Sequence, residues 1–470
     1  MIALDLTEIA SAVGAPLPAA GADVPVLTGP VVVDSRQAEP GSLFAAIDGA
    51  HVDGHDFLEA AAANGARAAL VTRPVPGAPI PTLLVPDVPA ALGDLAREVL
   101  ARLRERTGIR VVAITGSVGK TTTKDLLAQL LAGCGEVIAP VGSFNNEIGL
   151  PLTVLRAEES TRVLVLEMGA DAPGNLTYLT AIAPPDVAVV LMVGRAHLGG
   201  FGSLENVATA KAELVQGLTA DGIAVLNADD PRVAAMAAVA AGRDVLEFGT
   251  GAAAQVRAEE VRTDASGRLE LTLVAPQGSA PVRTALVGRH QVSNVLAAAA
   301  TALALGMSVT EVAAAAADAR VLSPHRMQVS RTGAVTVVDD SYNANPDSMR
   351  AALRALPLVA AGRRSVAVLG EMLELGETSA AEHAQVGAEC VRTGVQVVVT
   401  VGAGAEPIAE GARAAGAESV HSTANLEEAE QLLATLITEG DVVLVKSSNG
   451  AGLMRLAERL AAGEVQGAGQ

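Results

Sequence analysis

The spacing of apolar positions along this chain changes more than once, and it predicts most of the secondary structure. From residue 109, short and fully apolar runs alternate with longer segments in which apolar residues recur every three or four positions. Such runs are typical of strands buried on both faces of a parallel sheet, and the segments between them are typical of the covering helices. The predicted strands of this part are 109–114, 162–168, 186–193 and 222–227.

Two changes of pattern follow. Over residues 254–287, polar and apolar positions alternate around Ser266–Gly267, which predicts an antiparallel hairpin at an edge of the sheet. A long alanine-rich helix is expected from about Gln291, and the segment 320–327, with Ser323–Pro324, is interpreted as a linker. Beyond it the alternation restarts, and strands are predicted at 334–340, 364–370, 395–402 and 441–448.

The first part of the chain carries shorter signals. Residues 31–36 predict a strand that runs into polar residues, and 57–66 and 90–106 predict helices. Thr107–Gly108 is the expected boundary to the middle part. We therefore predict an α/β protein with three domains, at residues 1–107, 108–322 and 323–470.

Composition narrows the range of functions. The 470 residues include 33 Lys and Arg against 52 Asp and Glu, a formal net charge of −19, and half of the residues are apolar. A chain this apolar can fill several cores, which argues against disorder, and its acidity argues against broad nucleic-acid binding, which needs a basic surface. With five Phe, two Tyr and no Trp, base or sugar stacking is not expected as a main mode of recognition.

The same composition predicts a cytoplasmic protein. Its two cysteines, Cys134 and Cys390, lie far apart and form neither a disulfide framework nor a paired metal motif. No Lys or Arg precedes Arg36, so the basic start of a signal peptide is not found. The longest weakly polar stretch, Val295–Met307, is shorter than the ~20 apolar residues that a membrane-spanning helix needs, so no membrane insertion is expected.

A candidate phosphate-binding loop lies between the strand at 109–114 and a helix. Gly116 and Gly119 allow backbone N–H groups to converge on phosphate oxygens, and the start of the helix adds positive potential. Lys120 supplies a charge for the outer phosphates, and the Thr121 hydroxyl suits Mg²⁺. A glycine-rich turn with a chance lysine is the plainer interpretation, but strand, loop and helix together favour ATP binding. The loop reads Thr115-Gly116-Ser117-Val118-Gly119-Lys120-Thr121-Thr122, a shorter form of the pattern whose first glycine would fall at Ile114.

Three further residues are candidates for catalysis. Glu167 ends one predicted strand and His197 follows another, so both are expected at the sheet edge beside the phosphate loop. A carboxylate and an imidazole there suit a Mg²⁺ that bridges phosphate and substrate. The plainer interpretations are a solvated strand end and an ordinary loop histidine. Lys211 stands in a helical segment and is, by itself, typical of a surface lysine.

Several segments resemble the Mur ligases, the family that builds the peptide of bacterial peptidoglycan. The phosphate loop and GRHQVSN (288–294) are shared across that family. DSYNANP (340–346) and LGEMLELG (369–376) are narrower, and resemble the member that adds the dipeptide D-alanyl-D-alanine. The DNPR-like motif expected of the diaminopimelate- or lysine-adding member is not found. Further matching segments are SFNNEIGLPLTVL, LEMGA, AHLGGFGSLENVATAKAE, LNADDP and PHRM.

This resemblance implies an ATP-dependent amide ligase. It would join UDP-N-acetylmuramoyl-tripeptide to D-alanyl-D-alanine through an acyl phosphate, giving the pentapeptide precursor of peptidoglycan. It also implies a small mixed α/β domain that binds the uridine nucleotide, a central parallel-sheet domain that holds ATP on the phosphate loop, and a Rossmann-like α/β domain that contacts the dipeptide and the nucleotide. A monomer is expected.

The resemblance further implies roles for single residues. Lys120 and the loop amides of 116–122 would bind the outer phosphates, and Thr121 a first Mg²⁺. Glu167 and His197 would bind a second Mg²⁺, helped by Lys211, which matches the lysine that the family converts into a carbamate with CO₂. The other expected nucleotide contacts are Asn294, Arg326, Asp340, Tyr342 and Asn343.

Substrate contacts are expected mainly from the first domain. They are Ser35, Arg36 and Phe44, together with Asn145 and Asn146 of the middle domain. The loop HVDGHDF (51–57) matches a substrate loop of the family, although an ordinary polar loop or a crowded metal site are alternatives. Two departures from the family pattern are Gln291, where Asn is frequent, and Asn449, where an Arg was expected to pair with the dipeptide carboxylate.

Three other functions stay open at this point. One is another amide-forming relative, such as a folylpolyglutamate or cyanophycin-type synthetase. A second is a P-loop kinase or nucleotide switch without an amide product, and a third is a cell-wall scaffold that hydrolyses nothing. Release of ADP separates them, because only the ligase requires both peptide partners.

Overall fold

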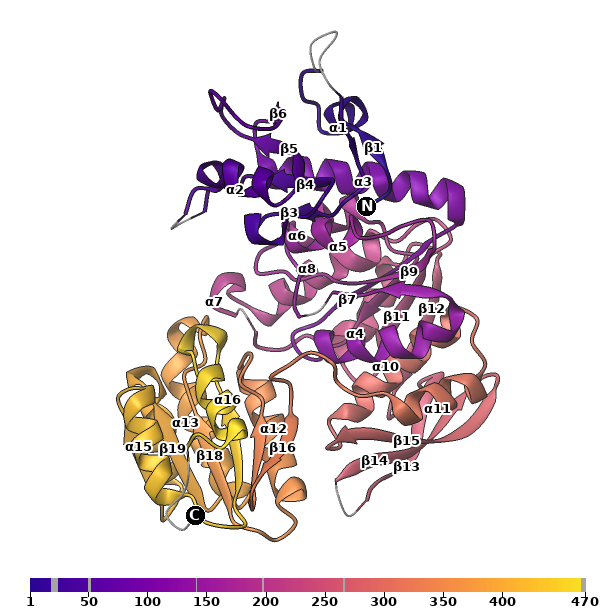
Figure 1. Ribbon diagram of the computed structural model, residues 1–470. Helices are drawn as coiled ribbons and strands as arrows, with labels where there is room; N and C mark the ends of the chain where they lie inside the picture. Colours follow the sequence, from indigo (N-terminus) through magenta and orange to yellow (C-terminus); the bar gives the residue numbers. More distant parts are fainter. Residues whose placement is uncertain (18–23, 50–51, 141, 197, 265–266, 466–470) are drawn as a thin grey trace.

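The computed structural model describes residues 1–17, 24–49, 52–140, 142–196, 198–264 and 267–465 (Figure 1). Within them, three α/β regions follow one another along the chain, as Figure 1 shows from indigo through magenta to yellow. The predicted fold class is confirmed. Short 3₁₀ turns complement the helices, at Ser35–Gln37, Gly54–Phe57, Leu131–Cys134, Ala235–Val239, Gly376–Thr378, Ala403–Ala405 and Asn449–Ala451.

The N-terminal region is built on a small parallel sheet in the order β3-β4-β5-β6, with a separate antiparallel pair of β1 and β2. Asp87 caps the long helix α3, which ends at Gly108 in the left-handed conformation. The strand predicted at 31–36 is shorter than expected, because Asp34 caps a 3₁₀ turn. The elements are β1 (Leu4–Asp5), α1 (Leu6–Ala12), β2 (Val26–Leu27), β3 (Val31–Val32), β4 (Ser42–Ala45), α2 (Leu58–Ala63), β5 (Ala66–Val71), β6 (Thr82–Leu84) and α3 (Val88–Thr107).

The central region has a nine-stranded sheet in its described residues, in the order β15-β14-β13-β12-β11-β10-β7-β9-β8. The strands from β8 to β12 are parallel, whereas β13, β14 and β15 pair antiparallel at the edge, as the alternating pattern predicted. The strands β8 and β12 were not predicted. The strands are β7 (Arg110–Thr115), β8 (Glu136–Ile138), β9 (Thr161–Glu167), β10 (Val187–Val190), β11 (Ile223–Asn227), β12 (Asp244–Gly249), β13 (Val256–Thr263), β14 (Arg268–Ala275) and β15 (Gly278–Val287).

Helices cover both faces of this sheet. On one face, α4, α10 and α11 enclose one apolar core, and on the other, α5, α6 and α8 enclose a core that also includes α3 and α1 of the N-terminal region. The first two regions therefore share a continuous core. The helices are α4 (Lys120–Leu130), α5 (Gly149–Val154), α6 (Asn175–Ile182), α7 (Leu198–Phe201), α8 (Leu204–Gln216), α9 (Pro231–Ala234), α10 (Gln291–Ala304) and α11 (Val309–Asp318).

The C-terminal region is a doubly covered sheet in the order β16-β17-β21-β18-β19-β20. Helices α12, α13 and α14 pack on one face, and α15 and α16 on the other. The four predicted strands are confirmed as β17, β18, β19 and β21, while β16 and β20 were not predicted. The elements are β16 (Gln328–Thr332), β17 (Val335–Asp339), α12 (Pro346–Ala360), β18 (Ser365–Leu369), α13 (Ser379–Arg392), β19 (Val397–Val401), α14 (Glu406–Ala414), β20 (Val420–Thr423), α15 (Leu426–Leu436), β21 (Val442–Lys446) and α16 (Met454–Ala462).

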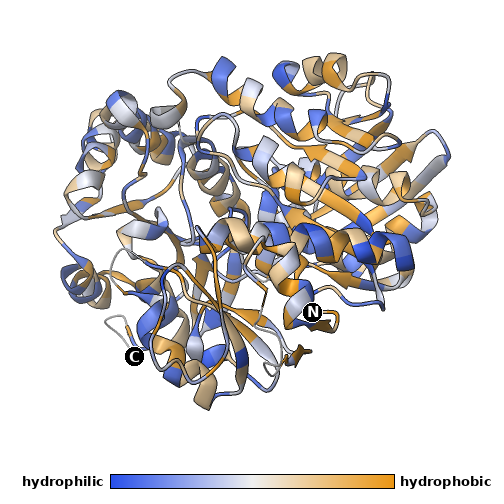
Figure 2. Cartoon of the chain, turned by 90° about the horizontal axis from the view of Figure 1, so that it is seen from above, coloured by the Kyte–Doolittle hydropathy of each residue, from blue (hydrophilic) through white to orange (hydrophobic). Residues whose placement is uncertain are grey.

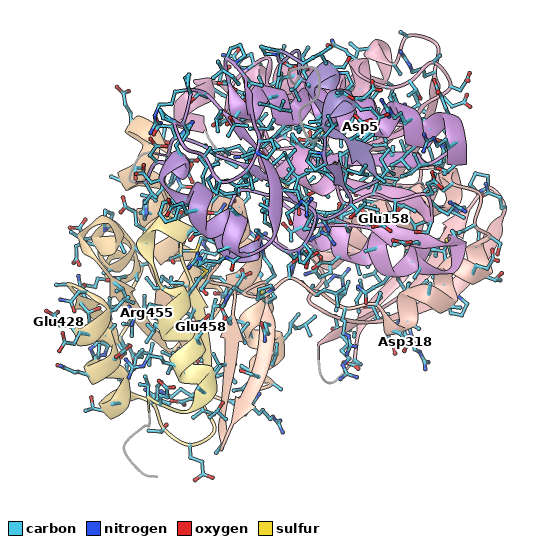
Figure 3. All side chains as sticks on the ribbon, turned by 45° about the horizontal axis from the view of Figure 1, so that its top comes forward. Asp5, Glu158, Asp318, Glu428, Arg455 and Glu458 are labelled. Atoms are coloured by element: carbon cyan, nitrogen blue, oxygen red, sulfur yellow. The ribbon has the colours of Figure 1, made fainter. Side chains whose placement is uncertain are left out.

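Hydrophobic residues concentrate on the strands, and hydrophilic segments lie along the outer helices (Figure 2). Charged side chains such as Asp318, Glu428 and Glu458 point away from the ribbon at the surface (Figure 3). The large negative net charge is therefore carried mainly by the surface, where it favours solubility. A search of the described helices finds none that is long and apolar enough to cross a membrane.

Candidate active site

The phosphate loop joins β7 to α4, as the sequence predicted. Gly116 and Gly119 have φ angles of 153° and 91°, which favour glycine. Gly119 has a second constraint, because a Cβ there would overlap the side-chain oxygen of Asn294 on α10. Asn294 thus supports the loop from behind, and its amide donates to Gln291 Oε1 at 2.7 Å. Gln291, the departure from the family pattern, therefore holds a residue expected to contact the nucleotide.

Lys120 points back across the loop. Its ammonium donates to the carbonyl of Gly116 at 2.7 Å. Burial lowers the pKa of Lys120, although the negative charge of Glu167 acts in the opposite direction. An ammonium held at this place, beside the N-terminus of α4, can neutralise the outer phosphates of a nucleotide.

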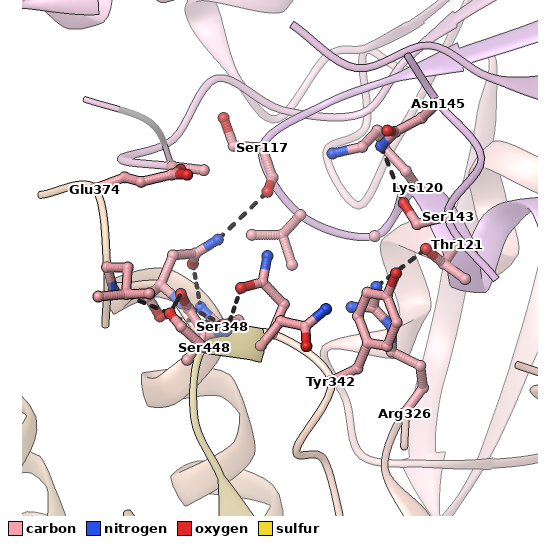
Figure 4. Close-up of a pocket in the computed structure, with 18 of the residues that line it drawn as sticks. Ser117, Lys120, Thr121, Ser143, Asn145, Arg326, Tyr342, Ser348, Glu374 and Ser448 are labelled. Carbon is pink, nitrogen blue, oxygen red and sulfur yellow. Dashed lines mark hydrogen bonds between the residues drawn. The ribbon is translucent and has the colours of Figure 1, made fainter. Parts of the chain in front are cut away.

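A cavity of about 350 Å³ lies between the phosphate loop and the C-terminal region (Figure 4). The loop supplies one wall, and Arg326 and the segment 342–345 supply the opposite wall. The structure thus brings together residues such as Thr121 and Arg326, 205 positions apart in the sequence, that the resemblance had assigned to one nucleotide site. The described lining residues are Ser117, Val118, Gly119, Lys120, Thr121, Thr122, Ser143, Asn145, Ala196, Arg326, Tyr342, Asn343, Ala344, Asn345, Ser348, Leu373, Glu374, Ser448, Asn449 and Gly450.

Arg326 lies between the two walls of this cavity. Its guanidinium stacks on the ring of Tyr342, 4.3 Å from the centroid, and its Nη2 donates to Thr121 Oγ1 at 3.3 Å. Its Nε is buried and has no hydrogen-bond partner in the described part of the chain. A buried donor without a partner is costly, so the site is suited to an anion that would accept from it.

Asp340 does not line the cavity but supports it. Its carboxylate pairs with the ammonium of Lys446 at 2.6 Å and accepts from the backbone N–H of Met327 at 3.1 Å. Lys446 also donates to the carbonyl of Asn343 at 2.9 Å. Burial lowers the pKa of Lys446, while Asp340 opposes that change. The sequence offered no signal for this partnership, because Lys446 lies in a different motif, at the end of β21.

A second cavity of about 150 Å³ adjoins the first, and Lys120 and Asn145 line both. Asn146 and Lys211 also line this smaller cavity. Two anionic groups, one in each cavity, would therefore meet at Lys120. Its described lining residues are Gly116, Lys120, Asn145, Asn146, Glu147, Gly169, Ala170, Asp171, Asn175, Tyr178, Leu179 and Lys211.

Glu167, at the end of β9, is 0% exposed, which excludes the solvated strand end. Its Oε2 accepts from Ser143 Oγ at 3.2 Å, and its Oε1 has no hydrogen-bond partner among the residues that the structure describes. A buried carboxylate oxygen without a partner fits a cation ligand. Among the described residues, no group of three His, Cys, Asp or Glu side chains is placed to hold a metal, so Glu167 would need other donors.

Lys211 is 4% exposed on α8, which excludes the surface lysine. Within the part of the chain that the structure describes, its ammonium has no hydrogen bond and no ion pair. Burial, with a smaller contribution from the charge of Lys120, lowers the pKa of Lys211 to about 7. A neutral amine is therefore accessible at neutral pH. His197, the remaining predicted ligand, lies outside the described residues.

The predicted substrate residues of the N-terminal region have different environments. Arg36 is exposed and pairs with Asp34 at 2.7 Å, which holds the pKa of Asp34 at about 2. Ser35 is buried, and its carbonyl accepts from Asn64. Phe44 is 1% exposed, so its ring fills the core between β4 and α2 and offers no surface to a ligand. The burial of this ring argues against the expected substrate contact through the Phe44 side chain.

The HVDGHDF loop has internal partners in its described part. His55 is buried, with Nδ1 2.6 Å from Asp53 Oδ1, and its Nε2 accepts from the backbone N–H of Thr72 at 3.0 Å. Asp53 also pairs with Arg73 at 2.7 Å. Both ring nitrogens are thus occupied, which argues against a metal site at His55.

Comparison with known proteins agrees with this geometry. Three family models match the chain: "Mur ligase family, catalytic domain" at residues 30–99, "Mur ligase middle domain" at 114–302 and "Mur ligase, glutamate ligase domain" at 325–449. The chain is 46% identical to the UDP-N-acetylmuramoyl-tripeptide–D-alanyl-D-alanine ligase of Mycobacterium tuberculosis, with 99% of each chain covered.

Solved structures give the same result. The crystal structure of MurF from Acinetobacter baumannii superposes with a TM-score of 0.85 at 30% identity, covering 97% of this chain and 98% of that one. MurF from Thermotoga maritima, in complex with ADP, has a TM-score of 0.78 at 31% identity and covers 93% and 98%. This chain belongs to the Mur ligase family.

Proposed function

We propose that this chain is an ATP-dependent ligase that joins UDP-N-acetylmuramoyl-tripeptide to D-alanyl-D-alanine. The observation that carries the proposal is the meeting of two cavities at Lys120, one lined by the phosphate loop and the other by Lys211 and Asn146. Such an arrangement suits a reaction in which a phosphate and a carboxylate must approach each other. The relatives named for this reaction supply the identity of the two peptide substrates.

In the first step, a carboxylate oxygen of the tripeptide attacks the γ-phosphorus of ATP. The new O–P bond forms as the bond from that phosphorus to the β–γ bridging oxygen breaks, giving an acyl phosphate and ADP. Lys120 neutralises charge on the transferring group, and the buried Nε of Arg326 supplies a donor on the opposite side. Positioning and charge neutralisation carry most of such a reaction.

In the second step, the free amine of the dipeptide attacks the acyl carbon. A tetrahedral intermediate forms and collapses, the C–O bond to phosphate breaks, and phosphate leaves as the amine loses its proton. The walls from the C-terminal region, including Asn343 and Ser348, close the cavity over the phosphate loop. Exclusion of water protects the acyl phosphate from hydrolysis.

Magnesium fits the donors that the structure presents. Glu167 Oε1 is buried without a partner from the described residues, and the Thr121 hydroxyl lies at the start of α4. We assign Thr121 as the protein ligand of a first Mg²⁺, and Glu167 and His197, together with Lys211 as a carbamate, as the ligands of a second. When bound, Mg²⁺ would neutralise the phosphates and polarise the γ-phosphoryl group.

Carbamylation of Lys211 is part of the same proposal. The buried amine has no described partner, and its lowered pKa of about 7 favours the neutral form that reacts with CO₂. The neutral amine nitrogen bonds to the carbon of CO₂ and releases one proton, so an uncharged group becomes an anion. A carbamate signal in ¹³C NMR after exchange with labelled bicarbonate supports this step. Its absence, in a folded and active enzyme, contradicts it.

The three regions divide the substrates between them in this proposal. The N-terminal region, with Ser35 and Arg36, binds the uridine nucleotide, the central region binds ATP, and the C-terminal region binds the dipeptide. The enzyme acts as a monomer in the cytoplasm, where ATP and UDP-linked precursors are found. The domain boundaries at 107/108 and 322/323 belong to this proposal.

The test is a product assay with purified protein, ATP, Mg²⁺, each candidate UDP-muramoyl-tripeptide and D-alanyl-D-alanine, read by mass. The expected result is the pentapeptide product, with ADP released only when both peptide partners are present. Release of ADP without the dipeptide would indicate a kinase or a nucleotide switch instead. Binding of the nucleotide peptide without any ADP release would indicate a scaffold.

A further inference from the structure

Two charged residues of α4 are buried together one turn beyond Lys120 and Thr121. Lys124 is 1% exposed and Asp125 is 3% exposed, and they form an ion pair of 2.9 Å. Neither lines the nucleotide cavity or the smaller cavity beside it. Removing two charges from water is costly unless each has a full set of partners, so the partners indicate what the pair does.

Asp125 holds the start of the interdomain linker. Its Oδ2 accepts from the backbone N–H groups of Leu322 at 2.9 Å and Ser323 at 2.7 Å, and its Oδ1 accepts from Ser323 Oγ at 3.0 Å. One turn farther along α4, Gln129 donates to the carbonyl of Arg320 at 2.7 Å and accepts from its N–H at 3.2 Å. This stretch of the linker is therefore fixed to the helix that begins at the phosphate loop.

Lys124 holds a second segment against the same helix. Its ammonium donates to the carbonyls of Pro140 and Gly142, the latter at 3.2 Å, and to Ser323 Oγ at 3.2 Å. The residue after Gly142 is Ser143, which donates to Glu167 and lines the nucleotide cavity. The ion pair thus connects the linker, the loop that carries Ser143 and the phosphate-loop helix.

The linker changes its attachment within two residues of Ser323. His325 is 2.7 Å from Asp339 through its Nδ1, and Met327 donates its N–H to Asp340 at 3.1 Å, so both belong to the C-terminal region. Only Pro324 lies between the two attachments. His325 and Met327 have φ angles of 59° and 50°, which non-glycine residues rarely adopt.

These two strained residues flank Arg326 on both sides. Strained backbone persists only where the surrounding structure determines it from several directions. The direction of the Arg326 side chain, toward Thr121 and Tyr342, therefore depends on the anchors before and after it. The anchor before it is Asp125.

We propose that Lys124 and Asp125 form a positioning pair that aligns the linker with the phosphate loop and thereby places Arg326 against the phosphates of the bound nucleotide. Neither residue touches the nucleotide. The inference takes the identity of that nucleotide from the proposed function, but its geometry involves only residues of this chain.

A double-mutant cycle tests this proposal on the full chain, with ADP binding measured by calorimetry. Asp125→Asn and Arg326→Ala are each expected to weaken ADP binding roughly tenfold, the size of one lost hydrogen bond to a charged group. Because Asp125 acts through Arg326, the double variant is expected to bind no more weakly than Arg326→Ala alone. The proposal is overturned if Asp125→Asn weakens ADP binding as much in the Arg326→Ala background as it does in the wild type. It is also overturned if Asp125→Asn alone binds ADP with wild-type affinity.

Two further variants separate positioning from general instability. Asp441→Asn removes an equally buried carboxylate, which accepts from the N–H of Thr438 at 2.8 Å, makes no hydrogen bond or ion pair with the described linker residues, and lies just before β21, at the opposite end of that strand from Lys446. It is expected to lower Tm without changing ADP affinity, and a loss equal to that of Asp125→Asn overturns the proposal. Ser323→Ala keeps the backbone bonds to Asp125, and its affinity is expected between wild type and Asp125→Asn. A wild-type chain that binds no ADP overturns the proposed function, and this inference with it.

Discussion

Two lysines face the smaller cavity, and the charges around them differ. Lys120 donates to the Gly116 carbonyl and is balanced by the charge of Glu167. Lys211 has no such compensation among the described residues, and the charge of Lys120 disfavours a second ammonium beside it. The Lys211 amine can therefore be neutral near pH 7, whereas a carboxylate opposes the effect of burial at Lys120. Groups whose environments separate their pKa values commonly have different tasks.

Replacement of Lys120 by Ala removes the one described ammonium that lines both cavities. We expect turnover to fall by about 10²–10³-fold or more, because a charge aimed at the transferring phosphoryl group is lost. The measurement is ADP release with both peptide substrates present. An unchanged rate in a folded Lys120→Ala variant would remove the assignment of the phosphate site.

Replacement of Lys211 by Met is expected to change stability in a pH-dependent way. The pKa of Lys211 is about 7 in the folded chain and 10.5 for an ordinary lysine. Below pH 7 the folded state must hold an uncompensated ammonium, which lowers the free energy of unfolding. This cost disappears as pH rises from about 7 to 10.5, because the unfolded chain then binds more protons than the folded chain. Each pKa unit corresponds to about 1.4 kcal/mol.

The Lys211→Met variant should therefore have a higher Tm than wild type near neutral pH, and the difference should shrink as pH approaches the ordinary lysine pKa. Thermal unfolding in CO₂-free buffer without Mg²⁺ measures it. Because both chains share all other titrating groups, their difference isolates Lys211. A constant difference in Tm across that range would contradict the lowered pKa.

At the scale of elements, the site depends on how closely α10 approaches the phosphate loop. A Cβ at Gly119 would overlap Asn294, and its φ of 91° is also unfavourable for alanine. Gly108, at the end of α3, has a φ of 66° and open space around its Cα. Alanine at position 108 would therefore have only the conformational cost of a positive φ angle. Alanine substitutions at Gly108 and Gly119 therefore separate the effect of backbone strain from that of steric overlap.

We expect Gly108→Ala to lower the free energy of unfolding by about 1 kcal/mol, the usual cost of a left-handed non-glycine residue, without affecting ADP binding. Gly119→Ala should cost more and should also weaken ADP binding, because the loop must move away from Asn294. Urea unfolding and calorimetry measure the two quantities. Equal losses of stability with intact binding in both variants would show that α10 does not constrain the loop.

Elements with contiguous signals could be predicted from the sequence, whereas elements defined by distant partners could not. The phosphate loop is a single run between an apolar strand and a helix, so its fold and chemistry can be predicted from neighbouring residues alone. The strand β16, with the sequence Gln328–Thr332, is mostly polar and forms because β17 pairs with it. The strand β20 is likewise short and exists as the partner of β19.

The same distinction holds for the site. Arg326 and Tyr342 were assigned only through a family resemblance, since nothing in their local pattern places them beside Thr121. Lys446 and Asp125 were missed, because a buried charge in a helix or strand is recognised only by its partner. The ring of Phe44 illustrates the reverse case, in which a motif match coincides with a core position.

At the scale of the whole molecule, the nucleotide cavity exists only because the C-terminal region lies against the central one. Beyond the contact of Arg326 with Thr121, Arg195 pairs with Glu382 of α13 at 2.7 Å, and Asn345 donates to the carbonyl of Ser117 at 3.4 Å. Glu382 also pairs with Arg350 of α12 at 2.7 Å. In the described residues, the apolar cores of the C-terminal region are separate from those of the central region, whereas α3 shares a core with the central helices. The C-terminal region is therefore the part that can move as a body.

Replacement of Glu382 by Gln tests that expectation, because it weakens the pairing of α13 with Arg195 while leaving the lining of the cavity intact. We expect the free variant to have a larger radius of gyration than wild type in small-angle scattering. Addition of ATP analogue and UDP-muramoyl-tripeptide should bring both proteins to the same compact form, because ligands that bridge the two walls stabilise the closed arrangement. The KM for ATP should then rise with little change in kcat, since part of the binding energy is used to close the enzyme. Identical scattering of the two proteins with and without ligands would show that the regions are held together by something other than these contacts.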